Sequence, residues 1–393
     1  MSQDDWDHSP LPIGILFSRT GVTSAVERTQ LSATRLAIAE INAAGGVAGR
    51  ELVGLGEDCE ADPKVFRREA TRLVEEAGVR LVFGCYMSST RKAVLPVVEA
   101  RGALLFYPTL YEGFEYSPSC IYTGAVPNQN SQPLVRYLMQ HHGPRMLLVG
   151  SNYIYPYESN RIFSDLVTAA GGRILDEIYV PLDPKPEDFE RVLRKISRLE
   201  PDAVFSTIVG SGTAQFYDAY RRAGLDAGRR PIASLTTGEA EVAEMTAEAA
   251  EGHLTAAPYF QSLDTPRNRA FLAAWRQHVG PEMPVTAAAE AAYFQVHLAA
   301  RAVAQARSTA REAVVEALGQ VQFEAPQGLV AIDPANNHCF LWPKVAKLDA
   351  KARFEVVWDP RRRITPDPYF ASASLDAWAL EDGPFGPQPA GIG

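Results

Sequence analysis

The chain has 393 residues, with 38 Lys or Arg against 47 Asp or Glu, so its formal net charge is −9, and 46% of its residues are hydrophobic. This length predicts two or three domains, each large enough to bury its own core. The acidic balance argues against direct nucleic-acid binding, which needs several cations on one face. No stretch approaches the roughly 18 apolar residues of a membrane span, so no membrane segment is expected.

Two features bear on the cellular compartment. The first residues carry three Asp before a five-residue apolar run, whereas a signal peptide has a basic start and a longer apolar stretch. The four cysteines show no CxxC spacing and are typical of reduced thiols: Cys59, Cys85, Cys120 and Cys339. We therefore expect a cytoplasmic protein, although a mature secreted chain with a new Met1 would look the same.

Short β-rich runs alternate with helical patterns along the whole chain, which is typical of parallel sheets with crossover helices. The first series has expected strands at 13–17, 51–58, 81–85 and 104–108. The second has expected strands at 146–152, 173–180, 203–210 and 231–237. After residue 258 we expect helices at about 266–278, 286–306 and 310–318, strands near 328–332, 339–348 and 353–358, and a Pro-rich extension over the last 30 residues.

Two βα series of similar size, followed by chain that returns to both, predict an α/β protein of two lobes joined by a hinge. In open α/β sheets the ligand lies at the carboxyl ends of the strands. The residues that directly follow the expected strands are therefore the candidate site.

Ser88 follows the third expected strand and stands at the start of a helix. The first backbone N–H groups of a helix have no intrahelical partner, so a polar ligand atom is favoured there. A plain helix cap is the other interpretation of this serine, and one serine can also serve in both ways.

Six tyrosines and one threonine crowd two loops that should face each other across the cleft. Tyrosine offers an apolar wall with a polar tip, which suits a small enclosed ligand, although packing between the lobes would also explain single members. The loops carry Tyr107, Thr109, Tyr111 and Tyr116 in one case, and Tyr153, Tyr155 and Tyr157 in the other.

The last two strand ends of the second series supply further candidates. These are Thr207, Val209, Thr236, Thr237 and Glu239. Glu239 could accept N–H bonds from an amide or urea, or could simply be a favourable acid in the first turn of a helix.

The loops hold no Arg or Lys placed to clamp a carboxylate or phosphate, because Arg91 and Lys92 are expected on the solvated face of a helix. The ligand should therefore be small and neutral. A ligand of about four heavy atoms gains at most roughly 6 kcal/mol, which corresponds to a dissociation constant of tens of micromolar.

Catalysis and cofactors find no support in the sequence. Cys85 has no histidine with an evident place beside it, and the glycine pairs lack a complete dinucleotide or phosphate-loop pattern. No metal-ligand motif is present either. We expect neither an enzyme, nor a cofactor, nor a metal.

A resemblance to a known family appears at GCYMSSTRKAVLPVVEARGALLFYPTLYEGFEYSP, residues 84–118. This string is similar to that of cytoplasmic amide sensors that negatively regulate bacterial amidase operons, within the type I periplasmic-binding-protein family. The similarity continues through VPNQNSQPL, GSNYIYPYESNRI, VFSTIVGSGTA, PIASLTTGEAEVAEM, APYFQSLDTP, AAEAAYFQ, APQGLVAID and NNH, and reaches PDPYFASASLDAW.

The resemblance implies two lobes with three crossings between them, which close on a short-chain amide such as acetamide. The matching positions are Tyr86, Ser88, Tyr107, Thr109, Tyr153 and Tyr155. Ser88 and Thr109 would bond the amide group, and the tyrosines would limit its acyl length. The implied lobes are residues 1–122 with 258–332, and residues 123–257 with 333–393.

The implied partner is an RNA-binding antitermination regulator, which the ligand would release; self-association of the chain is left open. Leu110 and Ser89 stand where we associate the amide regulators with proline and histidine, so ligand preference and regulatory outcome could both differ. The alternative is an extracytoplasmic receptor that delivers urea or short-chain amides to an ABC importer, because such receptors share similar strings.

Overall fold

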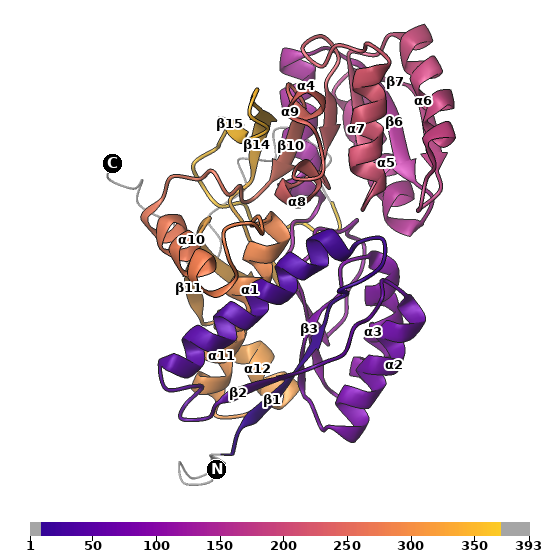
Figure 1. Ribbon diagram of the computed structural model, residues 1–393. Coiled ribbons are helices and arrows are strands. Elements are labelled where there is room, and N and C mark those ends of the chain that lie inside the picture. Colours follow the sequence, from indigo (N-terminus) through magenta and orange to yellow (C-terminus); the bar gives the residue numbers. More distant parts are fainter. Residues whose placement is uncertain (1–8, 371–393) are drawn as a thin grey trace.

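The computed structural model describes residues 9–370, which form two α/β sheets, each with helices on both faces (Figure 1). The predicted fold class is therefore confirmed. The chain begins in the first sheet, continues into the second, and returns to both after β10. The C-terminal extension expected over the last 30 residues lies mostly outside the described residues.

The first sheet has eight strands in the order β11-β12-β13-β5-β4-β3-β1-β2. Strands β1 to β5 are parallel, and β11 to β13 add an antiparallel part at one edge. The bounds are β1 Leu11–Leu16, β2 Leu52–Leu55, β3 Leu81–Gly84, β4 Leu104–Tyr107, β5 Cys120–Tyr122, β11 Gln322–Ala325, β12 Gly328–Asp333 and β13 His338–Phe340.

Two apolar clusters cover the faces of this sheet. One contains residues of α1 (Ser24–Ala43), α11 (Ala287–Ala306) and α12 (Arg311–Leu318), with α10 (Pro266–His278) beside them. The other contains residues of α2 (Pro63–Thr71), the π-helical turn Arg72–Glu76 and α3 (Ser88–Ala100). Because both faces are buried, the parallel strands are apolar runs rather than alternating ones.

The second sheet has seven strands in the order β15-β14-β10-β9-β8-β6-β7. Its strands are β6 Arg145–Ser151, β7 Arg173–Val180, β8 Ala203–Thr207, β9 Ile232–Ser234, β10 Leu254–Ala257, β14 Lys344–Leu348 and β15 Phe354–Trp358. Its helical elements are the 3₁₀ turn Pro127–Gln129, α4 Ser131–His141, α5 Ile154–Ala169, α6 Pro186–Leu199, α7 Gly212–Arg222, α8 Glu239–Val242 and α9 Ala247–Ala250.

Local sequence signals explain several helix starts. Asp62 accepts a hydrogen bond from the Lys64 N–H and Pro63 takes the first helical position of α2, the place where proline is tolerated best. Thr286 caps α11 by accepting from the Ala289 N–H. These caps direct both helices against the first sheet.

The chain passes between the sheets three times, after β5, after β10 and after β13. We expected the last division between residues 332 and 333, whereas β13 still pairs with β12 and β5 in the first sheet. The single strand expected near 339–348 is accordingly two strands that belong to different sheets. β11 was not anticipated, because its four residues form only the outer part of a hairpin.

We call the first sheet with its helices the first half, and the second sheet with its helices the second half. The two halves touch across the space between the sheets. Val26, Tyr86 and Met87 of the first half pack in one apolar cluster with Ala240, and Tyr153 lies against that cluster from the second half. This contact brings the ends of β3 and β6 together. The candidate site is therefore built from both halves.

Candidate functional site

A small cavity lies between the two halves, next to the first two crossings. Its volume is about 60 Å³. The first half and the crossings contribute Val26, Tyr86, Pro108, Thr109, Leu110, Thr123, Gly124 and Ala125, with Thr286, Ala287, Ala288 and Ala291 from α11 and its cap. The second half and the second crossing contribute Asn130, the segment 235–239, Glu241 and the segment 255–260. Neither Lys nor Arg is among these lining residues.

Six threonines line the cavity, but several of their hydroxyl protons are already used within the protein. A hydroxyl has one proton to donate and two lone pairs that accept. Thr109 donates to Cys85 O at 3.2 Å, Thr236 to Ile208 O at 2.9 Å, Thr255 to Thr237 O at 2.8 Å, and Thr123 to Gln295 Oε1 at 2.9 Å. These four hydroxyls can therefore offer a ligand mainly acceptors.

Two carboxyl groups add further acceptors to the wall. Glu239 accepts from the Gln261 N–H at 2.7 Å, and burial raises its pKa to about 7. Glu241 accepts from the Gly238 N–H at 2.9 Å, and burial raises its pKa to about 8. The wall is thus rich in acceptors and carries carboxyl groups that are partly protonated near neutral pH.

Tyr86 supplies a side-chain donor at the cavity. Its side chain lies at the cavity and is buried, and its hydroxyl forms no hydrogen bond with any residue between 9 and 370. Burial, with Glu241 nearby, raises the pKa of this phenol well above its usual value. The hydroxyl therefore keeps its proton and can donate it.

The structure brings four of the ten predicted site residues to this cavity: Tyr86, Thr109, Thr236 and Glu239. Tyr153 lies in the apolar contact with Tyr86, and its ring centroid is 6.3 Å from that of Tyr155. The other predicted residues bond elsewhere. Tyr107 donates to Tyr86 O at 2.7 Å, Thr207 donates to Asn160 Oδ1 at 2.9 Å, and the Val209 N–H bonds to Ser151 Oγ at 3.2 Å.

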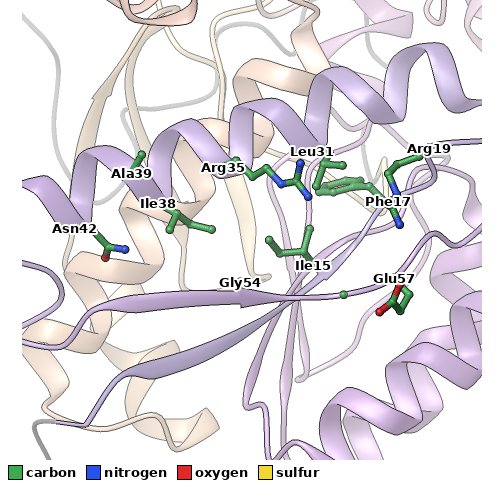
Figure 2. A pocket seen from close by; sticks show the side chains of 11 residues that line it. Ile15, Phe17, Arg19, Leu31, Arg35, Ile38, Ala39, Asn42, Gly54 and Glu57 are labelled. Atoms are coloured by element: carbon green, nitrogen blue, oxygen red, sulfur yellow. The ribbon is translucent and has the colours of Figure 1, made fainter. Parts of the chain in front are cut away.

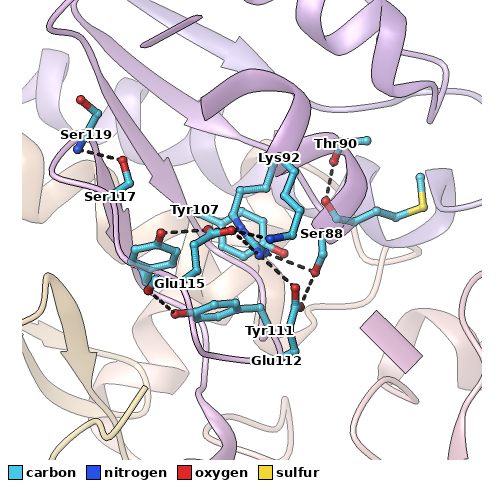
Figure 3. Close-up of polar contacts among 12 residues, drawn as sticks. Ser88, Thr90, Lys92, Tyr107, Tyr111, Glu112, Glu115, Ser117 and Ser119 are labelled. Carbon is cyan, nitrogen blue, oxygen red and sulfur yellow. Dashed lines mark hydrogen bonds and ion pairs between the residues drawn. The ribbon is translucent and has the colours of Figure 1, made fainter. Parts of the chain in front are cut away.

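Ser88 belongs to a buried polar cluster beside the cavity rather than to its lining (Figure 3). Its hydroxyl donates to Glu112 at 2.6 Å and accepts from Arg91 at 3.2 Å. It does not cap its own helix through the side chain, because no such bond forms at the start of α3. Neither interpretation considered from the sequence describes this arrangement.

Arg91 was expected on a solvated face, but it is fully buried. Its guanidinium pairs with Glu112 at 3.2 Å and Glu115 at 2.8 Å, and lies 4.7 Å from the centre of the Tyr107 ring and 4.6 Å from that of Tyr111. Burial opposes ionisation of Glu115, but Arg91 and Lys92 outweigh it and lower the pKa of this carboxyl to about 2. Arg91 is thus neutralised and is not offered to a ligand.

The tyrosine clusters do not form one continuous wall. Tyr111 and Tyr122 stack at 4.9 Å behind the cavity, and His338 stacks on Tyr122 at 4.3 Å. Tyr116 and Tyr157 are exposed. Packing, the alternative left open from the sequence, accounts for Tyr111.

A larger groove of about 330 Å³ lies between α1 and the edge strand β2 (Figure 2). Its floor includes Ile15 and Phe17, and Arg19 and Arg35 stand at its side. Gly54 keeps the space under α1 open, because a Cβ there would lie 2.6 Å from Ile15 Cδ1 and 3.5 Å from Ile38 Cδ1. All its lining residues come from the first half, so a ligand there would not bridge the two halves.

Four lining residues were not predicted from the sequence: Glu241, Thr123 at the first crossing, Thr255 in β10 and Thr286 at the start of α11. Glu241 lies in a four-residue helix, which is too short to show helical periodicity in the sequence. None of the three threonines follows a strand that the sequence predicts. Among residues 9–370 no group of His, Cys, Asp or Glu is arranged to hold a metal ion. None of the helices in that range has both the length and the apolar character of a membrane span.

Several known proteins with similar sequences are binding proteins. The chain is 26% identical to a Leu/Ile/Val-binding protein homolog of Brucella melitensis over 71% of this chain and 72% of that protein. It is 25% identical to the leucine-, isoleucine-, valine-, threonine- and alanine-binding protein of Pseudomonas aeruginosa, over 80% and 83% of the two chains.

Solved structures share the fold. A solute-binding protein of an ABC transporter from Rhodopseudomonas palustris, in complex with p-hydroxybenzoic acid, has a TM-score of 0.83 and 21% identity, covering 92% of this chain and 99% of its own. A branched-chain amino acid binding protein from Streptococcus pneumoniae, in complex with isoleucine, has a TM-score of 0.78 and 20% identity, covering 91% and 100%.

These findings correct one expectation and weaken another. The expected cytoplasmic location is wrong, because the matching family is that of periplasmic binding proteins and the structural relatives are solute-binding proteins of ABC transporters, which points to a place outside the cytoplasm. The relatives lend no support to an antitermination partner and favour the alternative of an importer's receptor. Residues 11–375 match the periplasmic binding protein domain, so the chain belongs to this family of ligand-binding proteins.

Proposed function

We propose that the protein is an extracytoplasmic solute-binding protein that takes a small neutral amide or urea between its halves for delivery to an ABC importer. The observation that carries this proposal is the polarity of the cavity wall. Four threonine hydroxyls donate into the protein, two carboxyls face the cavity, and neither Lys nor Arg lines it. Such a wall suits a ligand that has several N–H groups and one carbonyl oxygen.

The ligands of the relatives suit this wall less well. Isoleucine and p-hydroxybenzoic acid, the molecules bound in two structural relatives, both carry an acidic group that is ionised at neutral pH. A carboxylate only accepts hydrogen bonds, so it cannot donate to the threonine acceptors, and it meets like charge whenever Glu239 and Glu241 are ionised. Burying such an unpaired charge is costly.

Cavity size supports the same class of ligand. A volume of about 60 Å³ favours molecules of a few heavy atoms over benzoates. A ligand of about four heavy atoms can gain at most roughly 6 kcal/mol, so we expect dissociation constants of tens of micromolar or weaker. Such an affinity is compatible with release to a transporter.

Binding would be coupled to the contact between the halves. In this proposal Tyr86 of the first half donates to the ligand's carbonyl oxygen, while acceptors of the second half face its nitrogen. A ligand that bonds both halves binds the touching arrangement better than an open one, and that difference in affinity is the free energy available for closure.

Titration calorimetry with acetamide, urea and butyramide tests the proposal, with leucine and 4-hydroxybenzoate as competing classes. We expect saturable binding of at least one amide or urea. Binding of leucine or 4-hydroxybenzoate without any binding of the amides and urea would overturn the proposal. Solution scattering with the bound compound should show a smaller radius of gyration than without it.

A further inference from the structure

Glu241 combines two features that a helix cap alone does not require. It is the third residue of α8, and its Oε2 accepts the Gly238 N–H at 2.9 Å, which satisfies the start of that short helix. Its other oxygen, Oε1, is buried and has no hydrogen-bond partner within residues 9–370. The residue is only 3% exposed, so this oxygen does not simply point into bulk water.

Among the described residues, no cation pairs with Glu241. The residue lines the cavity and forms no ion pair in the part of the chain that the structure describes. The titratable groups near it are Glu239 and Glu244 on its own segment, Tyr86 from the opposite half, and Tyr217 from α7. None of these is a cation, so the unsatisfied oxygen has a high cost unless something in the cavity donates to it.

Tyr86 lies across the cavity with the complementary polarity. Its hydroxyl keeps its proton and lies at the cavity, whereas Glu241 Oε1 is a buried oxygen without a hydrogen-bond partner within residues 9–370. A primary amide or urea presents a carbonyl oxygen and an NH₂ group side by side, and so could satisfy both atoms at once. An ester or carboxylate of the same shape lacks the N–H donor.

On the basis of the proposed function, we propose that Glu241 determines ligand specificity: its Oε1 accepts a hydrogen bond from the ligand nitrogen, and so selects primary amides and urea over isosteric carboxylates. The second half then accepts a hydrogen bond from the ligand nitrogen, while the first half donates one to the carbonyl oxygen. Removal of either contact should weaken binding and closure together.

The variant Glu241→Gln tests this assignment with little change of shape. Its amide oxygen can replace Oε2 as the acceptor of the Gly238 N–H, which places the NH₂ group where Oε1 stands. An acceptor in the cavity thereby becomes a donor, while the helix cap is kept. Glu244→Gln is the matched control, because Glu244 lies on the same segment, is exposed and does not line the cavity.

Titration calorimetry of the wild type and both variants with acetamide, urea and acetate gives the result. For E241Q we expect affinity for acetamide and urea to fall about 10- to 100-fold, with acetate binding unchanged or stronger, and with a melting temperature close to that of the wild type. E244Q should match the wild type throughout.

The outcomes separate this inference from the proposed function. If the wild type binds acetamide or urea and E241Q binds them equally well, the role of Glu241 is overturned while the proposed function stands. If the affinity of E241Q falls equally for acetate and for the amides, Glu241 shapes the cavity without accepting a hydrogen bond from the ligand nitrogen, and the inference also fails. If the wild type binds neither amides nor urea, the proposed function fails first and the inference with it.

Discussion

Gly210 of the second half lies directly against the backbone of Val22 in the first half. A Cβ at position 210 would stand 2.2 Å from Val22 O and 3.0 Å from its carbonyl carbon. Val22 follows β1 and Gly210 follows β8, so this contact joins the ends of two strands from different sheets. The halves can approach this closely only because residue 210 has no side chain.

Substitution of this glycine should therefore separate the halves. In Gly210→Ala the new methyl group clashes with Val22 O only when the halves touch, so the open form is favoured and amide affinity should fall about tenfold or more. Scattering should give a larger radius of gyration for the ligand-free variant. Gly224→Ala is the control, because φ is +64° at Gly210 and +70° at Gly224, yet a Cβ on Gly224 meets nothing within 4 Å.

Both alanine variants carry the strain of a side chain at positive φ, which costs about 1 kcal/mol. Only the 210 variant should also lose affinity and compactness. Equal amide affinity in the two variants would show that the Gly210–Val22 contact does not belong to the ligand-bound arrangement.

The phenols of Tyr86 and Tyr107 should have separable roles. Tyr86→Phe removes a hydroxyl without a partner within residues 9–370, so stability should change little while acetamide affinity falls about tenfold. Tyr107→Phe removes the donor to the buried Tyr86 carbonyl at 2.7 Å, so it should lower the free energy of unfolding by about 1 to 2 kcal/mol. Chemical denaturation and calorimetry on both variants measure the two effects. If Tyr107→Phe lowered the affinity for acetamide but not the free energy of unfolding, Tyr107 would instead belong to the ligand site.

Much of the fold could be predicted from the sequence because regular βα alternation is a local signal. The strands and helices of both series follow apolar periodicity and caps such as Asp62, which act within a few residues. The third crossing could not be placed as well, because β13 and β14 lie four residues apart and only pairing with different sheets distinguishes them.

The candidate site was predicted less completely, since orientation decides which side chains reach the cavity. Tyr107 ends a strand, as expected of a site residue, yet its hydroxyl turns back to the Tyr86 carbonyl. Arg91 lies one turn into a helix, as a solvated cation would, yet two carboxylates and two aromatic rings enclose it. Such long-range partners leave no periodic signal in the sequence.

Amide binding should depend on pH through Glu241. An ionised carboxylate is the stronger acceptor for an N–H group, so ligand binding should favour the ionised form and release protons. The pKa of Glu241 is raised to about 8 and that of Glu239 to about 7; Glu244, Tyr86 and Tyr217 are the other titratable groups that face Glu241. Affinity should therefore rise with pH up to about 8, by as much as about tenfold per unit below that value.

Calorimetry in two buffers of different ionisation enthalpy measures the protons released. In E241Q the release should fall to the part contributed by Glu239. An affinity that is constant from pH 6 to 8 in the wild type would contradict preference for the ionised carboxyl.

Glu115 should make the first half sensitive to acid. Its pKa is lowered to about 2 because the pairing with Arg91 and Lys92 outweighs the cost of burial. In the unfolded chain the pKa of a Glu is about 4.3. The folded state thus holds the proton less tightly, so this stabilisation is present above about pH 4.5 and is lost as the pH falls towards about 2. Glu115→Gln should lower the free energy of unfolding by about 3 kcal/mol at pH 7, and the difference from the wild type should shrink at pH 4 and again at pH 3.

Glu312→Gln, which breaks the surface pair with Arg311, is the control and should change stability little at any of these pH values. Urea denaturation at each pH measures the free energy of unfolding of the wild type and both variants. If the destabilisation of Glu115→Gln did not vary with pH, its cause would be lost packing and not the loss of the charge that Arg91 stabilises.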